Sequence, residues 1–422
     1  MRDRRGVHRA DDPVLVAKLL RGSYEMDLGE VKAFLPARVP LEELPPVFDR
    51  YQTACGELPA RYPAGSGGVR IWLESEFRQE EPAVRDAIPC LTPAERDRLM
   101  TLLGVLGHTY RWDCVPPTPA RFKERRIPLP SGIAQPWSAL ARASGQPRVG
   151  TTWSLHLSNW AMTDKPGGSS YRTDELTQRN VRIAQNWLRA PANTHLERFS
   201  TSFVLVEAQG AAVLKQLVET VEAIAACRMD DVLVALEELQ VAVKAMTTAF
   251  SLNVRRGTVN PAVWLKLVQP TFAWSAEAEE PGRVEPGPSG MQMGTVQALD
   301  AAFGVVGGSE LAALSEAGRR YMPEPHRRFL QALDRAGPVI RSFVQQSRCE
   351  DLIIQFNKCV GALGSFRATH QARGRQYLRD HPDGVVARTS TGLTIGTGDD
   401  PIATFERTMG ERAAETEAAK LS

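Results

Sequence analysis

Helical periodicity in the second half of the chain is the feature that most constrains its fold. Apolar residues recur at three- and four-residue steps through residues 199–226 and 229–251, and the pattern breaks near Cys227. The same spacing returns across residues 338–380, and residues 401–420 are expected to form a further, exposed helix. Apolar residues at this spacing share one face of an α-helix, which needs another element to cover it. Because alternating strand patterns are scarce, the sequence predicts a mainly α fold.

A proline-rich stretch separates these helices from the N-terminal part. Residues 114–150 hold many prolines, which interrupt helices and are typical of a connection. Before this stretch, Thr92 is a predicted N-cap with Pro93 at the first helical position. A chain of 422 residues is long enough for more than one domain. We therefore expect a small, mostly helical N-terminal domain at residues 1–130 and a large all-α domain at residues 131–422.

Charge and apolar content argue against several classes of protein. The net charge of +2 indicates no basic surface for nucleic acid. No apolar run reaches the length of a membrane span, and the N-terminal residues lack the apolar core of a signal peptide. These features predict a cytoplasmic protein without nucleic-acid or membrane partners, and they leave its oligomeric state open. The six cysteines form no CxxC motif, which argues against structural zinc, iron–sulfur clusters and covalently attached haem.

One histidine in the last long helical stretch is a candidate metal ligand. Leu363, Phe366, His370 and Tyr377 share one helical face, and Arg367 lies one turn before the histidine. A core-facing histidine beside arginines has the groups that haem requires, namely an imidazole for the iron and cations for the propionates. On this local pattern alone, a hydrogen-bonded core histidine is the simpler interpretation, because nothing nearby identifies a metal.

Common catalytic motifs are absent from the sequence. None of the seven histidines belongs to an HExxH motif, and there is no P-loop, no GxSxG and no GxGxxG after a strand. The usual signatures of zinc hydrolases, nucleotide-binding enzymes and α/β-hydrolases are therefore missing. Residue chemistry alone describes a mostly helical protein with one candidate haem ligand.

Several segments, taken in order, resemble the indoleamine 2,3-dioxygenase family. The chain carries GHTYRW at 107–112, VEAQGA at 206–211, MPEPHRRFL at 322–330 and LGSFRATH ending at His370, and a Gly-Thr-Gly loop follows. That family has an MPxxHRxFL segment, a haem-ligating histidine downstream and a GTG loop beyond it. The resemblance covers roughly residues 90–410. It implies a helical enzyme that uses haem and O2 to oxidise an indole.

The resemblance implies roles for residues around the cofactor. His370 would be the proximal ligand of a non-covalent haem b. Arg367 and Asp300 match an Arg–Asp pair that helps to hold the proximal side of the haem. Ser289 and Gly290 would lie near the haem edge and the substrate.

Other matched positions concern the substrate pocket. Phe199 would line its distal side, and Gly396, Thr397 and Gly398 match the loop that closes over the bound indole. Phe199 and Thr397 are therefore candidate catalytic residues. His326 belongs to the MPxxHRxFL motif and is interpreted as structural, because its neighbours are of the kind that cap and pack a helix.

Two substrate-pocket positions depart from the family pattern. Gln269 stands where the family usually has an arginine that pairs with the substrate carboxylate. A neutral amide cannot equal such a charge-assisted pair, which is worth about 1.5–3 kcal/mol. Phe203 stands where the family has a small distal serine, and it would reshape the pocket; a register shift of one residue would place Ser202 there instead.

His156 is a third departure and a further candidate catalytic residue. It matches an apolar pocket position of the family, whereas other members of the superfamily have a distal histidine. A neutral imidazole there can accept the indole N–H, and the alternative is a buried, hydrogen-bonded histidine. The surrounding residues 151–162, TTWSLHLSNWAM, fit a short helix or a buried strand equally.

Three functional hypotheses follow. The first is a haem dioxygenase that opens the indole C2=C3 bond of tryptophan or a derivative, with O2 as co-substrate and a reductant for the haem. The second is a haem monooxygenase or rearranging enzyme of a tryptophan-derived natural-product pathway, which Gln269 and His156 favour. The third is a haem-binding sensor without turnover, against which the Gly-Thr-Gly loop argues because a sensor has less need of a substrate lid.

Overall fold

The computed structural model describes residues 32–62, 67–336, 338–379 and 401–422. Over these ranges helices dominate, and the strands form two short antiparallel ribbons. In the first ribbon β1 (Trp160–Met162) pairs with β2 (Val181–Ile183), and in the second β3 (Ala276–Glu277) pairs with β4 (Val284–Glu285). The predicted mainly α fold is confirmed. Among the helices of the described ranges, none combines the length and the apolar character that crossing a membrane requires.

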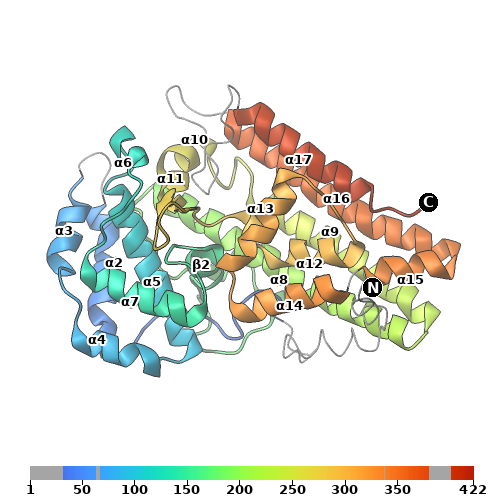
Figure 1. The fold of residues 1–422 in the computed structure, drawn as a ribbon, viewed down its shortest axis with the longest axis horizontal. Coiled ribbons are helices and arrows are strands. Elements are labelled where there is room, and N and C mark those ends of the chain that lie inside the picture. Colours follow the sequence, from blue (N-terminus) through green and yellow to red (C-terminus); the bar gives the residue numbers. More distant parts are fainter. Residues whose placement is uncertain (1–31, 63–66, 337, 380–400) are drawn as a thin grey trace, which may run out of the picture.

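The N-terminal part is built around helix α5 (Pro93–Trp112), in which every residue from Arg98 onward is buried. Thr92 begins this helix as predicted: its hydroxyl accepts the Glu95 N–H at 3.3 Å, and the Glu95 carboxylate accepts the Thr92 N–H at 2.8 Å. Shorter helices surround α5 (Figure 1): η1 (Pro46–Phe48), α2 (Asp49–Arg61), α3 (Val69–Glu76), α4 (Pro82–Ala87), η2 (Ile88–Cys90), α6 (Pro119–Lys123) and α7 (Ser131–Ser144). Helix α7, which follows residue 130, packs against α5. The division of the chain into domains at residue 130 stays a prediction.

Four long helices form the second part. Helices α8 (Ala192–Ala225) and α9 (Met229–Asn253) make a hairpin that turns at Cys227, where the periodicity predicts the break. Helix α16 (Glu350–Arg379) packs on α9, and α17 (Pro401–Glu417) runs along α16 (Figure 1). Shorter helices complete this part: η4 (Thr173–Glu175), η6 (Gly290–Gln292), α12 (Gly294–Phe303), α13 (Glu310–Gly318), η7 (Arg319–Tyr321), α14 (Glu324–Ala336) and α15 (Val339–Ser347).

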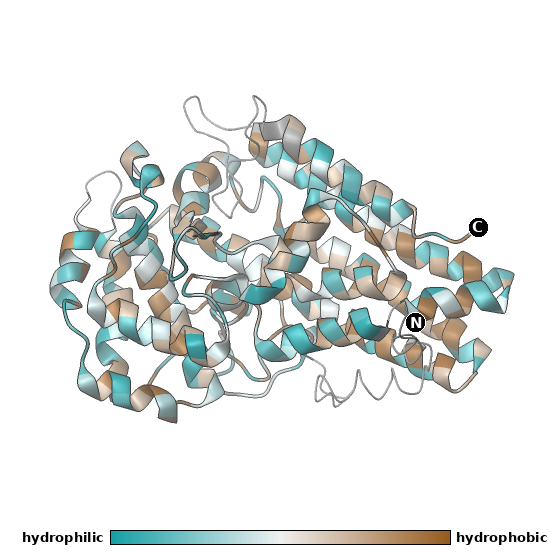
Figure 2. Ribbon diagram, viewed as in Figure 1, coloured by the Kyte–Doolittle hydropathy of each residue, from teal (hydrophilic) through white to brown (hydrophobic). Residues whose placement is uncertain are grey.

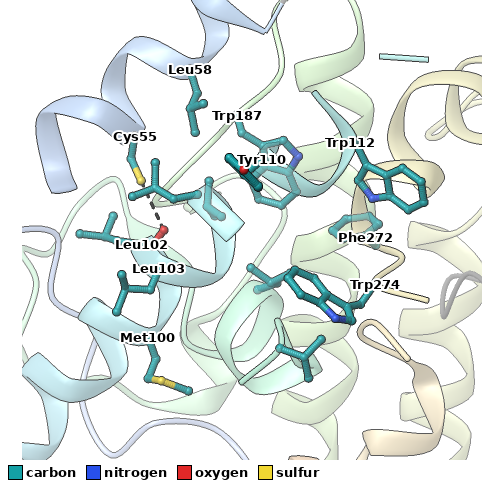
Figure 3. Packing of buried hydrophobic residues seen from close by; sticks show 14 of the residues in the cluster. Cys55, Leu58, Met100, Leu102, Leu103, Tyr110, Trp112, Trp187, Phe272 and Trp274 are labelled. Atoms are coloured by element: carbon teal, nitrogen blue, oxygen red, sulfur yellow. Dashed lines mark hydrogen bonds between the residues drawn. The ribbon is translucent and has the colours of Figure 1, made fainter. Parts of the chain in front are cut away.

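Apolar burial follows the amphipathic pattern of these helices. Figure 2 shows hydrophobic and hydrophilic residues alternating along the ribbons of the long helices. One large buried cluster surrounds α5, and Figure 3 shows Trp112, Trp187, Phe272 and Trp274 within it. A second large cluster lies between α8, α9, α12 and α16. Phe272 belongs to the first cluster and also contacts His156, so the N-terminal core supports one wall of the candidate site.

Candidate functional site

Two π-helical turns lie on one side of the candidate site. The first, η3 (Trp153–Leu157), carries His156 within the segment that fits helix or strand equally by sequence. The second, η5 (Trp264–Val268), follows α10 (Pro261–Val263) and leads directly into α11 (Gln269–Phe272). Both π-turns pack against α8. Such turns are rare and occur frequently at functional sites, because the extra residue redirects side chains.

His156 lies in a wall of aromatic rings. Its imidazole stacks on Phe203 with ring centroids 4.4 Å apart and an interplanar angle of 7°. Phe272 and Phe199 contact it edge-on, at 4.8 and 6.0 Å. The side chain is buried, and Nδ1 has no hydrogen-bond partner among the described residues. Burial lowers the pKa of His156 to about 3, so its ring is neutral at physiological pH.

Phe203, rather than Ser202, faces His156. The Ser202 hydroxyl donates to the backbone carbonyl of Phe199 at 2.6 Å, so it is satisfied within α8. The Phe199 ring contacts Phe203 at 5.3 Å and Trp264 at 5.3 Å. The larger side chain therefore shapes this wall.

Gln269 opens α11 and is buried. It lies three residues before Phe272, whose ring contacts His156, so two of the three departures from the family pattern, Gln269 and His156, lie in elements that contact each other. From η5, the Trp264 ring contacts Tyr377 of α16 at 5.4 Å. The aromatic wall thus reaches the helix that carries His370.

Ser289 is connected to the turn that carries His156. The Thr152 hydroxyl accepts the Ser289 N–H at 2.9 Å and donates to the Ser289 carbonyl at 2.8 Å. Thr152 immediately precedes η3, and Gly290 follows Ser289 as an exposed residue at the start of η6. Ser289 and His156 are thereby held in adjoining segments.

His370 lies on α16 with its imidazole partly exposed. Phe250 of α9 and Phe405 of α17 contact the ring at 5.6 and 6.4 Å. No described residue forms a hydrogen bond with either ring nitrogen. Loss of water from around the ring lowers the pKa of His370 to about 4, and the positive charge of Arg367 lowers it further. A neutral imidazole with unengaged nitrogens is the form that binds a metal.

The donor groups around His370 fit haem better than a protein-only metal site. Across the described ranges, no group of three or more His, Cys, Asp or Glu side chains is placed to hold a metal ion. Zinc sites usually take three or four protein ligands, whereas haem iron takes its equatorial ligands from the porphyrin and needs one axial imidazole. A neutral imidazole with an arginine one turn away is compatible with haem, and His370 is the residue that would hold its iron.

Arg367, one turn before His370, is part of a buried charged cluster. It pairs with Asp300 of α12, as the resemblance implies, and its other terminal nitrogen donates to Thr416 of α17. Arg412 of α17 donates to the second carboxylate oxygen of Asp300 at 2.6 Å. Asp300, Arg367 and Arg412 are each at most 9% exposed, so water contributes little to their solvation.

The contribution of α17 is missing from the sequence prediction. The expected helix is present at residues 401–417, but its expected exposure is wrong for one face. Met409, Arg412 and Thr416 are buried on that face. The signal is their spacing of three and four residues, yet an arginine and a threonine do not resemble a buried stripe in a sequence.

The two other predicted features are His326 and the Gly-Thr-Gly loop. His326 is buried between the rings of Phe34 and Trp153, each 5.0 Å away, which is a packing role. Gly396, Thr397 and Gly398 lie outside the described residues.

The chain is similar in sequence to known dioxygenases. The model of the family Indoleamine 2,3-dioxygenase matches residues 23–378. Indoleamine 2,3-dioxygenase 2 of Mus musculus is 25% identical over 68% of this chain and 72% of its own length. Indoleamine 2,3-dioxygenase 1 of Mus musculus is 24% identical over 91% of this chain and 92% of its own. 6-Hydroxytryptophan 2,3-dioxygenase fscD of Fusarium equiseti is 22% identical over 87% of this chain and 88% of its own.

Proposed function

The chain belongs to the indoleamine 2,3-dioxygenase family, and from that premise we propose that it oxidises the indole C2=C3 bond of tryptophan or a tryptophan derivative. Both oxygen atoms of O2 would enter the product, which would be of the N-formylkynurenine type. The observation that carries this proposal is His370, a neutral imidazole with no hydrogen bond from the described residues. It lies beside a buried Arg–Asp pair, and the sequence resemblance implies that it is the haem ligand.

The cofactor and the protein would have different roles in the reaction. Haem, when bound, would supply the oxygen chemistry with O2 as co-substrate, and a reductant would be needed only to bring its iron to the ferrous form. His370 would hold the iron through one ring nitrogen. The pairing of Arg367 with Asp300 holds the preceding turn of α16 in place. Phe199, Phe203 and the other rings of the wall exclude water and offer flat surfaces against which an indole can lie.

His156 supplies a polar group in that wall. With a pKa of about 3, it carries one N–H and one acceptor nitrogen at pH 7 and cannot act as a cationic acid. We propose that it accepts the indole N–H and so orients the ring. Its position among Phe199, Phe203 and Phe272 supports this role, because an indole that enters there meets few other polar groups.

The identity of the haem ligand can be tested by substitution. Purified protein supplied with haem should show a Soret band, and His370→Ala should lose most of the bound haem. His195→Ala is the matched control, because this partly exposed histidine contacts the Asn260 N–H and faces no charged cluster in the described structure. Normal haem retention by His370→Ala would exclude the proposed ligand.

A second candidate function is oxidation of a modified tryptophan in a natural-product pathway, by dioxygenation, monooxygenation or rearrangement. Buried Gln269 favours it, because a neutral amide gives no charged partner to a substrate carboxylate. Two fungal relatives carry the names 6-hydroxytryptophan 2,3-dioxygenase fscD and indoleamine 2,3-dioxygenase acdA, which also fits a pathway role.

One experiment separates these functions. The reduced haem protein is given 18O2 and a panel of tryptophan, hydroxytryptophans and indoles without a carboxylate, and products are analysed by mass spectrometry. Two labelled oxygen atoms identify a dioxygenase, and one identifies a monooxygenase. No oxygen consumption with any indole would contradict both enzymatic proposals and leave the haem-binding sensor as the remaining hypothesis.

The role of Gln269 can be tested in the same assay. Gln269→Arg should lower the KM for L-tryptophan by about tenfold or more, since a charge-assisted pair is worth about 1.5–3 kcal/mol. The KM for an indole without a carboxylate should change little. Equal changes for both substrates would show that Gln269 does not face the carboxylate.

A further inference from the structure

Asp300 is shared by arginines from two different helices. Arg367 of α16 donates to one of its carboxylate oxygens, and Arg412 of α17 donates to the other at 2.6 Å. A carboxylate that accepts from two guanidinium groups is fixed in both position and rotation. Arg412 therefore restrains Asp300, which in turn restrains Arg367.

The shared carboxylate is one part of a longer chain of contacts. The second terminal nitrogen of Arg412 donates to Glu415 at 2.6 Å. Glu415 in turn accepts both the N–H and the hydroxyl of Ser309, each at 2.9 Å, at the start of α13. Two arginines and two carboxylates balance one another in charge, so the cluster is neutral as a unit and α12, α13, α16 and α17 meet in it.

Helix α17 also contacts α16 directly beside His370. The Phe405 ring lies 6.4 Å from the imidazole. A Cβ placed on Gly374, one turn after His370, would lie 2.4 Å from the same ring, so the two helices approach closely there. On the other side of His370, Arg367 donates to Thr416. Helix α17 thus holds α16 both before and after the candidate ligand.

We propose that Arg412 is a positioning residue for haem ligation. By donating to the second carboxylate oxygen of Asp300, it fixes the turn of α16 that carries His370. This inference rests on the proposed function, in which His370 binds the haem iron. Arg412 forms ion pairs with Asp300 and Glu415, so its effect on His370 would pass through Asp300 and Arg367. Residues hydrogen-bonded directly to a metal ligand typically change metal affinity by about 10–100-fold when substituted, and Arg412, which acts through two further residues, should have an effect at or below the lower end of that range.

The test compares Arg412→Met with a control on the same helix. Arg407→Met also removes an arginine from α17, but Arg407 is 54% exposed and pairs with Glu411 and Glu310 at the surface. Haem dissociation is measured by transfer to apomyoglobin, and the absorption spectrum of the reduced, haem-loaded protein is recorded. Arg412→Met should lose haem up to about tenfold faster than wild type and shift the reduced spectrum, whereas Arg407→Met should match wild type.

Arg412→Lys distinguishes positioning from general destabilisation. Lysine keeps the charge but not the two-pronged geometry, so it should restore folding while haem loss stays faster than in wild type. Wild-type haem retention and an unchanged spectrum in Arg412→Met would overturn the role of Arg412 and leave the proposed function intact. A wild-type protein that binds no haem, or binds it without His370, would overturn both. Spectra that match wild type, with only the melting temperature lowered, would show a purely structural residue and also overturn the inference.

Discussion

The two histidines of the candidate site are both neutral, but their surroundings differ: the charge of Arg367 contributes only at His370. Removal of water lowers the pKa of His370 to about 4 and that of His156 to about 3. Around His370, the neighbouring turn is fixed by Asp300, Arg367 and Arg412, which are buried and paired. Around His156 there are rings and no ion pair among the described residues.

Because of this difference, the two sides should respond differently to substitution. A buried charged cluster tolerates little change, because loss of one member leaves another charge uncompensated in a poorly solvated place. A wall of rings tolerates exchange of one apolar side chain for another of similar volume at modest cost. We therefore expect the residues around His370 to tolerate few substitutions, because they hold the cofactor. The residues around His156 should tolerate exchange and so adapt to the substrate.

The largest effect is expected at Asp300. Asp300→Asn removes the negative charge that two buried arginines share, so the free energy of unfolding should fall by about 3–5 kcal/mol. Urea denaturation measures this loss. Asp334→Asn is the matched control, since Asp334 pairs with Arg319 at the surface and is 45% exposed. Equal losses in the two variants would contradict the distinction between a buried cluster and surface pairs.

Glu207 links the two sides and gives the next largest effect. It lies one turn after Phe203 on α8 and accepts the hydroxyl and the N–H of Thr295, near the start of α12. Gly210 permits this approach, because a Cβ there would lie 2.2 Å from the Thr295 hydroxyl. Five residues further along α12 is Asp300. The same short helix therefore meets the pocket-wall helix at one end and the charged cluster at the other.

The pH dependence of stability tests this link. Burial raises the pKa of Glu207 from 4.5 to about 7, so the folded protein holds a proton that the unfolded chain has released. Its contribution is fully present below pH 4.5 and is lost as the pH rises toward 7, by on the order of 3 kcal/mol. Glu207→Gln should unfold like wild type near pH 4.5 and be more stable at pH 8. Glu219→Gln, at a partly exposed position on α8 beside Lys215, should follow the wild-type curve.

A smaller effect is expected at His156. His156→Phe keeps the stacked ring on Phe203 and removes a buried Nδ1 that has no partner, so stability should rise by about 1 kcal/mol. Indole turnover should fall at the same time, because the ring no longer accepts a hydrogen bond. Thermal unfolding and the product assay measure the two changes. Loss of stability with unchanged turnover would place His156 in the core rather than in the site.

The long helices could be predicted because their information is local. The break at Cys227 and the cap at Thr92 follow from residues within one or two turns. The place of His370 on an apolar helical face could be predicted from periodicity, but its proposal as a haem ligand needed the resemblance. Local patterns are sufficient where a helix buries one face against its neighbours.

The features that the sequence did not predict depend on contacts between residues far apart in the chain. The π-turn η3 gives residues 153–157 no periodicity that distinguishes it from a helix or strand. The burial of Arg412 requires α17 to return along α16 and face Asp300, 112 residues away in sequence. Neither composition nor spacing specifies that return.

The smallest effect is expected at Arg407, and it sharpens the comparison most directly. Arg407 and Arg412 lie on the same helix, and each contacts two acidic side chains. They differ in burial, because the Arg407 side chain is 54% exposed and that of Arg412 is 8% exposed. Surface pairs are screened by water and salt, so Arg407→Met should leave the urea midpoint unchanged within error at physiological salt. An effect as large as that of Arg412→Met would mean that the number of ion pairs, and not their burial, holds α17 against the helix of His370.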